Sequence, residues 1–340
     1  MRDQLNDMQL YLIDEFVEDY QEGLLTRRDA LRRIAAISGS LVFATTLLAA
    51  CGEAATASPT AAGAAATPTT GAAAASPTAA SAAAASPTAA PPPATPAPPD
   101  PEVSVAESDP AIIAQSISFP GQDATLMGYV SRPPGDGPFP LILVCHENRG
   151  LTDHIRDVTR RLAKAGYAAM AVDLLARQGG TAKIAFEDVA GVLGQLPEGQ
   201  PAQDFQSALS FLQGQPFADK ARVGMVGFCY GGGVTWRVAT KTPELLAAVP
   251  FYGPAPKIEE VPGINAAVLA IYAEQDERIN AGIPDIEAAM KQNNKTFEKV
   301  IYPGVNHAFH NDTGARYNRE QAKAAWAKTL EWFGRYVRDA

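Results

Sequence analysis

Cys229 lies in a sequence setting that suits a nucleophile. The run Gly227-Phe228-Cys229-Tyr230-Gly231 follows an apolar stretch, residues 222–226, and precedes residues that can begin a helix. A strand that turns sharply into a helix exposes the residue at the turn, and the flanking glycines avoid collisions with neighbouring backbone. The helix N-terminus would favour a thiolate and a developing oxyanion. We therefore predict that Cys229 attacks a carbonyl carbon; the alternative is a small, buried cysteine in a glycine-rich turn.

A thiol nucleophile of this kind needs a base, and histidine is the first candidate. The chain has four histidines, of which His307 and His310 follow the elbow. His307 comes directly after a glycine-containing turn that ends the apolar stretch 296–302. We predict that His307 accepts the thiol proton and returns it to the leaving group. His310, one turn further on, is the alternative base.

The carboxylate that orients the base is expected between the nucleophile and the histidine. Asp276 begins a loop just after the apolar stretch 267–272, with Glu274 and Glu277 as alternatives. We prefer Asp276, which would hold the imidazole in the required tautomer. The order of nucleophile, acid and base is that of the α/β-hydrolases. The acid and base candidates both follow predicted strands, at the edge where open α/β sheets bind ligands.

The elements that must position these residues alternate along the chain. Apolar strands are predicted at residues 141–145, 168–172, 223–226, 247–251, 268–272 and 297–302, with helical stretches between them. This alternation is typical of a parallel sheet covered by helices. A leading hairpin at 116–119 and 125–129 and a final helix near 319–336 complete the predicted domain, residues 106–340.

Several segments outside the elbow carry a family pattern. They are Cys145-His146-Glu147-Asn148-Arg149-Gly150, Val172-Asp173-Leu174-Leu175-Ala176-Arg177-Gln178, Asp276 and Gly304-Val305-Asn306-His307-Ala308-Phe309. Together with the elbow they make the chain, from about residue 116 onward, resemble the dienelactone hydrolase (carboxymethylenebutenolidase) family. The resemblance implies an α/β-hydrolase fold with a mostly parallel central sheet flanked by helices. It also implies hydrolysis of a small-molecule ester or lactone, which here would proceed through a thioester acyl-enzyme.

The resemblance assigns roles in the reacting centre. Cys229, Asp276 and His307 would form a Cys-Asp-His triad. Glu147 matches the family glutamate that contacts the resting thiol and helps to deprotonate it when substrate arrives. Cys145 lies inside an apolar run and is predicted to be a buried core thiol without a catalytic role.

The resemblance also assigns substrate contacts. Asn148 and Tyr230 would lend backbone N–H groups to the oxyanion hole. Arg177 matches an arginine that binds the substrate carboxylate. His310 stands where family members that cleave dienelactone usually carry a second arginine. Because imidazole binds a carboxylate less well than a guanidinium does, the preference for dienelactone itself is in question.

The first 51 residues look like an export signal. Arg27-Arg28 precedes an apolar run, residues 34–50, which ends in Leu48-Ala49-Ala50-Cys51. This pattern resembles a bacterial lipoprotein signal with a twin-arginine mark, and it predicts lipidation of Cys51. The protein would then be extracytoplasmic and anchored to a membrane through that lipid. The alternative for 34–50 is an uncleaved anchor helix, although the run is short for one.

Two further stretches lie around this signal. Within residues 1–25 apolar side chains follow helical spacing, which predicts an amphipathic helix of unknown use; they are Leu10, Leu12, Ile13, Phe16, Val17 and Tyr20. Residues 52–105 are rich in Ala, Pro, Thr and Ser, and the hexapeptide Ala-Ser-Pro-Thr-Ala-Ala begins at Ala57, Ala75 and Ala85. Such a composition offers little to bury and predicts a disordered tether.

Composition narrows the classes of function. The chain has 28 basic and 37 acidic residues, a formal net charge of −9, which argues against nucleic acid as a partner. No motif implies a cofactor, a metal or a protein partner, and three widely spaced cysteines provide no disulfide framework. Two alternatives to the lactone hydrolase remain: a broader carboxylesterase or acyltransferase with the same triad, and a binding protein whose catalysis has lapsed.

Overall fold

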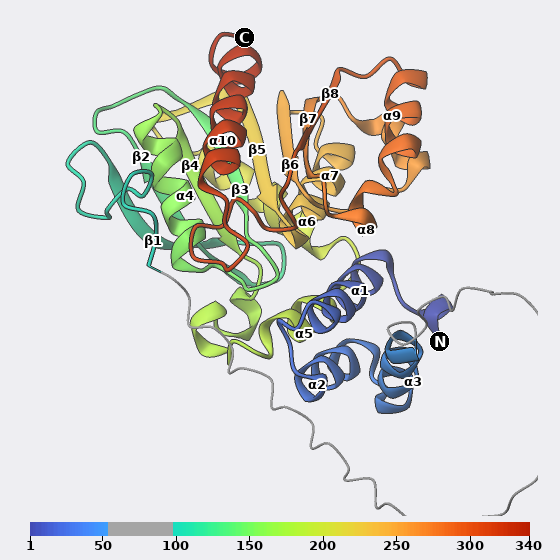
Figure 1. Ribbon diagram of the computed structural model, residues 1–340. Helices are drawn as coiled ribbons and strands as arrows, with labels where there is room; N and C mark the ends of the chain where they lie inside the picture. Colours follow the sequence, from blue (N-terminus) through green and yellow to red (C-terminus); the bar gives the residue numbers. More distant parts are fainter. Residues whose placement is uncertain (54–97) are drawn as a thin grey trace, which may run out of the picture.

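The protein is built around one eight-stranded sheet, seen in a computed structural model that describes residues 1–53 and 98–340 (Figure 1). The strand order is β1-β2-β4-β3-β5-β6-β7-β8. The strands are β1 (Ile113–Pro120), β2 (Thr125–Arg132), β3 (Phe139–Cys145), β4 (Ala168–Asp173), β5 (Ala218–Phe228), β6 (Ala247–Phe251), β7 (Ala267–Ala273) and β8 (Phe297–Tyr302). β2 is antiparallel to both β1 and β4, and the other pairs are parallel.

The interior strands are apolar along their whole length because both faces of the sheet are covered. Every residue of β4, β6 and β7 is buried, as expected for parallel strands between two helical layers. The edge strand β1 keeps most of its residues partly or fully exposed. All six predicted apolar strands and the leading hairpin are confirmed.

Four helices cover the two faces. α4 (Asp153–Lys164) and α10 (Arg319–Phe333) pack on one face, and α6 (Gln200–Gln213) and α7 (Tyr230–Lys241) pack on the other (Figure 1). The predicted final helix is therefore confirmed, and a π-helical turn, Gly334–Arg338, extends it. The shorter helices are α5 (Val189–Gly194), α8 (Glu277–Asn280), α9 (Ile283–Gln292) and the 3₁₀ turns η1 (Arg2–Gln4), η3 (Ala176–Gln178), η4 (Thr181–Lys183) and η5 (Ile258–Gly263).

Three helices precede the sheet: α1 (Asp7–Gln21), α2 (Arg27–Ser38) and α3 (Leu41–Glu53) (Figure 1). α1 and α2 lie beside α5, and α3 packs on α1 and α2. The amphipathic helix predicted within residues 1–25 is thus confirmed as α1. The apolar run 34–50 is divided between α2 and α3 at Gly39, whose φ of 69° ends α2 in the left-handed conformation. Over residues 1–53 and 98–340, no helix combines the length and apolar character that crossing a membrane requires.

The predicted tether lies mostly outside the described residues, including all three hexapeptides. The packed structure begins ahead of the predicted boundary at residue 106. Asp100 is buried and accepts hydrogen bonds from Tyr317 and Arg319, each at 2.9 Å, and Val105 is buried as well. Composition did not reveal this because the packing partners of Asp100 lie more than 200 residues away.

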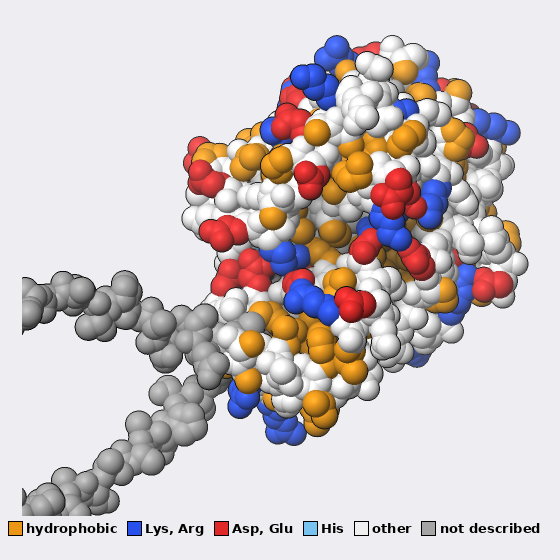
Figure 2. Space-filling model, turned by 90° about the vertical axis from the view of Figure 1, so that its right-hand side faces the viewer, with side chains coloured by type: hydrophobic (Ala, Val, Ile, Leu, Met, Phe, Trp, Pro, Cys, Tyr) orange, Lys and Arg blue, Asp and Glu red, His pale blue; other side chains and the backbone are white. Residues whose placement is uncertain are grey.

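The surface of the N-terminal helices is partly apolar. Large apolar side chains exposed there are Leu24, Leu41 and Val42, and Figure 2 shows hydrophobic side chains gathered on this part of the molecule. Acidic and basic side chains mingle along its boundary with the larger body (Figure 2). Ion pairs such as that between Glu18 and Arg278 join the two parts.

Candidate active site at the nucleophile elbow

Cys229 lies at the turn between β5 and α7 in a strained conformation. Its φ of 57° and ψ of −120° are unusual for a residue other than glycine. A Cβ atom at Gly227 would lie 2.2 Å from the carbonyl oxygen of Gly231, and one at Gly231 would lie 2.4 Å from that of His146. No side chain fits at either position, which confirms the predicted need for both glycines.

His307 and Asp276 are joined at the carboxyl ends of two neighbouring strands. The Nδ1 atom of His307 lies 2.6 Å from Oδ2 of Asp276, and both side chains are buried. The other oxygen of Asp276 accepts a hydrogen bond from the backbone N–H of Ile279 at 3.3 Å and caps α8. Of the alternative acids, Glu274 instead accepts from the backbone N–H of Gly304 at 2.8 Å. The carboxylate next to the imidazole is therefore the preferred Asp276.

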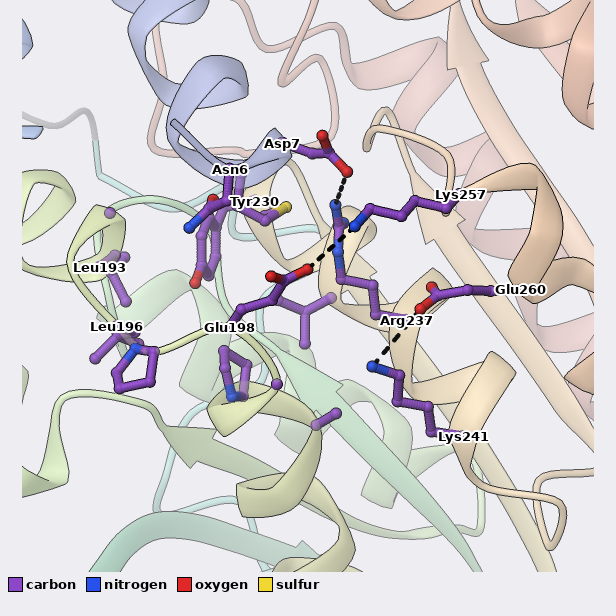
Figure 3. Close-up of a pocket in the computed structure, with 17 residues that line it drawn as sticks. Asn6, Asp7, Leu193, Leu196, Glu198, Tyr230, Arg237, Lys241, Lys257 and Glu260 are labelled. Carbon is purple, nitrogen blue, oxygen red and sulfur yellow. Dashed lines mark hydrogen bonds and ion pairs between the residues drawn. The ribbon is translucent and has the colours of Figure 1, made fainter. Parts of the chain in front are cut away.

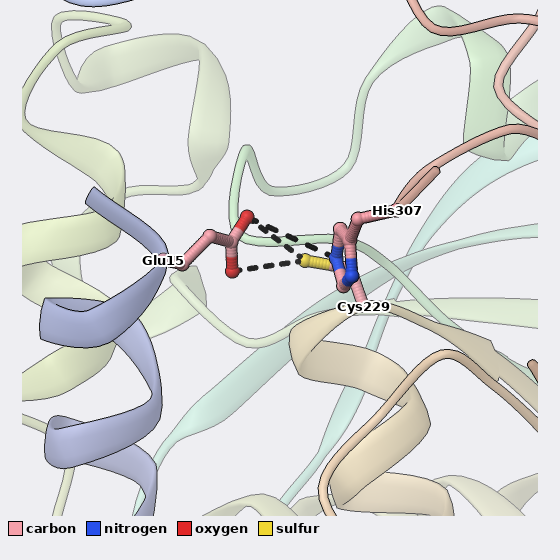
Figure 4. A group of neighbouring side chains, drawn as sticks. All are labelled: Glu15, Cys229 and His307. Atoms are coloured by element: carbon pink, nitrogen blue, oxygen red, sulfur yellow. Dashed lines mark hydrogen bonds and ion pairs between the residues drawn. The ribbon is translucent and has the colours of Figure 1, made fainter. Parts of the chain in front are cut away.

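The imidazole is within reach of the sulfur. A ring nitrogen of His307, Sγ of Cys229 and a carboxylate oxygen of Glu15 all lie within 4.8 Å of one another (Figure 4). Nδ1 of the imidazole faces Asp276, so Nε2 is the nitrogen that faces the thiol. The hydroxyl of Tyr11 lies between the two groups, 3.2 Å from Sγ and 3.4 Å from Nε2.

The electrostatics of the pair favour a protonated thiol in this arrangement. Burial and then the charge of Glu15 raise the pKa of the Cys229 thiol, against the lowering effect of His307. Burial disfavours the imidazolium, but the Asp276 carboxylate outweighs it and raises the pKa of His307 well above its ordinary value. The helix N-terminus was expected to favour a thiolate; desolvation and a neighbouring carboxylate oppose that effect here.

Two residues of the N-terminal helix α1 belong to this site, and the sequence pattern did not reveal them. Both oxygens of Glu15 lie 3.5 Å from Sγ of Cys229, and Oε1 accepts a hydrogen bond from Nδ2 of Asn148 at 2.8 Å. Tyr11 and Glu15 are each about 5% exposed. A carboxylate between Leu12 and Phe16 on the apolar side of α1 was the one sequence signal that could have pointed to them.

The structure does not bring Glu147 against the thiol. Its Oε2 atom accepts a hydrogen bond from Nδ2 of Asn311 at 2.5 Å, and its side chain is buried. The carboxylate in contact with the sulfur is that of Glu15. The resting contact that the family resemblance implied for Glu147 is therefore made by a residue from a different part of the chain.

The two residues predicted to bind substrate, Arg177 and His310, contact other residues of the protein. Arg177 pairs with Asp204 at 2.8 and 3.0 Å and also with Asp123, and these bonds raise the pKa of its guanidinium. His310 is 1% exposed and stacks on Phe228, with ring centroids 5.0 Å apart. Burial lowers its pKa well below the ordinary value. In this structure the contacts of Arg177 are thus with carboxylates of the protein, and those of His310 are with buried aromatic rings.

The predicted oxyanion donors, Asn148 and Tyr230, follow β3 and the nucleophile, as expected. Tyr230 is the first residue of α7, directly after Cys229, and Asn148 follows β3, next to Glu15. Over residues 1–53 and 98–340, the backbone N–H groups of these two residues have no hydrogen-bond acceptor. Both can therefore donate to an oxygen that enters the site.

The remaining cysteine and histidines are structural. Cys145 is fully buried in β3, as predicted, and burial raises the pKa of its thiol well above the usual value. His146 contacts the carbonyl oxygen of Glu147 through Nδ1 at 2.7 Å. His154 contacts Oδ1 of Asp312 through Nδ1 at 2.6 Å. No partner could be assigned to these histidines from the sequence.

A pocket opens beside the elbow. It lies between the beginning of α1, the segment from α5 to α6, and α7 (Figure 3). Tyr230 and Arg237 of α7 line it together with Asp7 of α1. An oxygen of Asp7 is 3.9 Å from a guanidinium nitrogen of Arg237. None of Cys229, Asp276 and His307 is among the residues that line this pocket.

Comparison with known proteins places this site in a family. The model of the dienelactone hydrolase family matches residues 126–337, which include Cys229, Asp276 and His307. The chain belongs to the dienelactone hydrolase family. It is therefore a hydrolase, with the fold that the resemblance implied.

Relatives within the family cover the same part of the chain. A carboxymethylenebutenolidase homologue from Methylorubrum extorquens is 37% identical over 238 residues, which are 66% of this chain and 82% of that protein. One from Escherichia coli strain K12 is 33% identical over 242 residues, 66% of this chain and 88% of that protein. A dienelactone hydrolase homologue of known structure from Klebsiella pneumoniae is 35% identical, with a TM-score of 0.62, and covers 66% of this chain and 100% of its own.

Proposed function

We propose that this protein is a cysteine-dependent hydrolase of small-molecule esters or lactones. Cys229 is the nucleophile, His307 the general base and acid, and Asp276 the residue that orients His307. The observation that carries the proposal is the strained elbow of Cys229 together with the 2.6 Å contact between His307 and Asp276 beside it. A strained nucleophile is held ready for attack, and the fixed imidazole tautomer presents Nε2 to its proton.

The reaction would proceed in two steps, acylation of Cys229 and hydrolysis of the thioester. Sγ of Cys229 attacks the carbonyl carbon as its proton passes to Nε2 of His307. The tetrahedral intermediate collapses to a thioester, and the imidazolium returns the proton to the leaving alkoxide. Water, deprotonated by the same imidazole, then opens the thioester, which releases the acid and the free thiol. With a lactone, the alcohol and the acid remain in one product molecule.

The oxyanion would be stabilised by two backbone donors. The N–H groups of Asn148 and Tyr230 would receive it, and each such donor is worth about 3 kcal/mol in comparable enzymes. Glu147 and Arg177 are proposed to act on the substrate only after a change of partners, because in this structure Asn311 binds Glu147 and Asp204 binds Arg177. His310 is proposed to shape the site from beneath the elbow.

The thiol mechanism has a direct test. Protein that is cut within residues 54–97 and separated from its N-terminal fragment should release p-nitrophenol from short-chain acyl esters. It should also form a thioester adduct on Cys229, detected by mass spectrometry in acid-quenched samples. Cys229→Ala should abolish both signals, whereas Cys145→Ala should leave hydrolysis intact because Cys145 is a core residue. Hydrolysis that survives in Cys229→Ala at the parent rate would overturn the mechanism.

We also propose that the protein is exported and lipidated at Cys51, as an extracytoplasmic, membrane-anchored lipoprotein. The support is the arrangement of Arg27-Arg28, the apolar run 34–50 and the small residues before Cys51. Cells fed an alkyne-tagged fatty acid should label the parent chain and not Cys51→Ala. Equal labelling of both chains would overturn the proposal.

A further inference from the structure

The thiol of Cys229 has no path to a substrate in this structure. Its residue is 2% exposed, and the hydroxyl of Tyr11 and the carboxylate of Glu15 lie 3.2 and 3.5 Å from the sulfur. A carbonyl carbon has to approach to about 3–3.5 Å before attack. α1 therefore occupies the space that the reacting group needs (Figure 4).

α1 contacts the site with one continuous stripe of polar side chains. Asp7, Tyr11 and Glu15 are four residues apart and so lie on the same face of the helix. Asp7 points towards Arg237 (Figure 3), Tyr11 bridges the thiol and the imidazole, and Glu15 accepts from Asn148. The stripe spans the site from the pocket on α7 to the predicted oxyanion loop.

Charge holds the other end of α1 against the loops of the triad. Arg278, two residues after Asp276, pairs with Glu18 at 3.2 Å, and its guanidinium lies 4.7 Å from the centre of the Tyr11 ring. Glu22 accepts from Nδ2 of Asn306, the residue before His307, at 2.7 Å. Further along, Arg316 pairs with Asp19 at 2.8 Å and with Glu22 at 2.6 Å.

The apolar side of α1 is buried against the rest of the protein. Leu12, Ile13 and Phe16 are each at most 1% exposed. Gly194 of α5 faces this surface, because a Cβ atom there would come within 3.0 Å of Ile37 and 3.4 Å of Leu12. Burying three such side chains is worth several kcal/mol. These side chains thus belong to the same buried core as the sheet.

We propose that α1 is an intramolecular inhibitor of the unprocessed chain, which occupies the substrate cleft, and that a cut between α1 and β1 opens the active site. The cleavage ahead of Cys51 that a lipoprotein signal entails would be such a cut. This inference rests on the proposed function, because the reaction that α1 would inhibit is ester or lactone hydrolysis by Cys229. While the chain is intact, α1 is covalently joined to the domain, so its binding is intramolecular and dilution cannot remove it. After a cut, the segment becomes a separate ligand that dilution can remove.

The test compares one protein before and after a cut. A recognition sequence for a site-specific protease is inserted within residues 54–97, outside the described residues, and the cut protein is separated from its N-terminal fragment. Removal of the fragment should raise the rate of iodoacetamide alkylation at Cys229 at least tenfold, with Cys145 as the buried control. The rate of ester hydrolysis should rise in parallel.

The outcomes separate the two proposals. Equal alkylation of Cys229 before and after removal of the fragment would overturn the inhibitor. Faster alkylation without any Cys229-dependent hydrolysis of esters or lactones would support the proposal that α1 covers the thiol. It would contradict the proposal that the protein is a hydrolase of this kind. If the fragment fails to dissociate after the cut, the uncut Tyr11→Ala/Glu15→Ala double variant takes its place and should show the same rise.

A synthetic peptide tests whether α1 inhibits when it is added back to the cut protein. The peptide of residues 6–22, added to the cut protein, should slow alkylation and hydrolysis and compete with substrate. A peptide with Glu15→Gln should inhibit less well, because an amide oxygen accepts from Asn148 less strongly than a carboxylate does. Asp14→Asn is the matched control: it removes the same charge one residue away, and Asp14 pairs only with Arg2, at 2.7 Å on the exposed side. Equal loss of inhibition by both peptides would contradict the assignment.

Discussion

Two buried histidine–aspartate pairs lie in this protein, and they have the same short contact. Nδ1 of His307 is 2.6 Å from Asp276, and Nδ1 of His154 is 2.6 Å from Asp312. The first imidazole turns its other nitrogen towards a thiol. The Nε2 atom of the second has no hydrogen-bond partner among the described residues, and its ring packs edge-on against Phe228.

The two histidine–aspartate pairs differ in their surroundings. Asp312 is held by Arg161 at 2.7 Å as well as by His154, so its pair belongs to a buried ion network in which Arg161 also binds Asp157. The Asp276 pair lacks such an arginine bridge and ends at the nucleophile. The geometry between histidine and aspartate is shared, and the group facing Nε2 separates the two roles.

The largest effect should come from exchanging the histidine in each pair. In protein cut within residues 54–97, His307→Gln should lower kcat/KM for ester hydrolysis by roughly 10⁵-fold, since the nucleophile loses its base. His154→Gln should keep kcat/KM near the parent value and lower the midpoint of thermal unfolding. Steady-state kinetics and calorimetry on both variants measure this. Similar losses of activity in the two variants would show that the pairs are not distinct.

The next effect concerns stability. Asp312→Asn removes the charge that Arg161 and His154 share in the interior, and it should lower the free energy of unfolding at neutral pH by about 3 kcal/mol. Urea unfolding followed by tryptophan fluorescence measures the change. Lys328→Gln, which removes a partly exposed ion pair with Glu298, should cost about 1 kcal/mol or less. If Asp312→Asn costs no more than this control, the network does not stabilise the fold.

Asp312 also determines how the stability of the fold changes as the pH falls. Burial alone would raise the pKa of Asp312, but hydrogen bonds and charge from His154 and Arg161 outweigh it and hold the pKa well below its usual range. Its unfolded pKa is about 3.9, so its stabilisation is complete above that value and is lost as the pH falls further. The parent should therefore lose more stability between pH 5 and pH 3 than Asp312→Asn does. Equal losses would contradict this.

The smallest expected effect concerns the pKa of the Cys229 thiol. In the uncut chain, Glu15→Gln removes a charge that raises the pKa of the Cys229 thiol. The pH midpoint of Cys229 alkylation should consequently move to lower pH, and the rate at neutral pH should increase. Asp14→Asn should leave the midpoint where it is. A shift to higher pH in Glu15→Gln would show that Glu15 assists deprotonation of the thiol.

Much of the fold and the cluster of Cys229, Asp276 and His307, the proposed triad, could be predicted from the sequence. Continuous apolar runs predict buried parallel strands, and the elbow glycines are required by contacts that are local to one turn. Asp276 and His307 could be placed because parallel strands end at one edge of the sheet. Arg177 and His310 could not be assigned reliably. Their roles depend on which carboxylates and aromatic rings the fold brings beside them, and no local pattern encodes that.

The sequence by itself determined the sheet, the elbow and the order of the triad, because each is specified by residues within a strand and the loop that follows it. Only the tertiary structure decided which carboxylate faces the sulfur. Glu15 and Tyr11 are separated from Cys229 by more than 200 residues, and they reach it because α1 packs on α5 and α7 and pairs with charged and polar side chains of the loops that carry Asp276 and His307. Burial and pairing over such distances depend on the whole packed chain, whereas strand and turn propensities depend on neighbours in sequence.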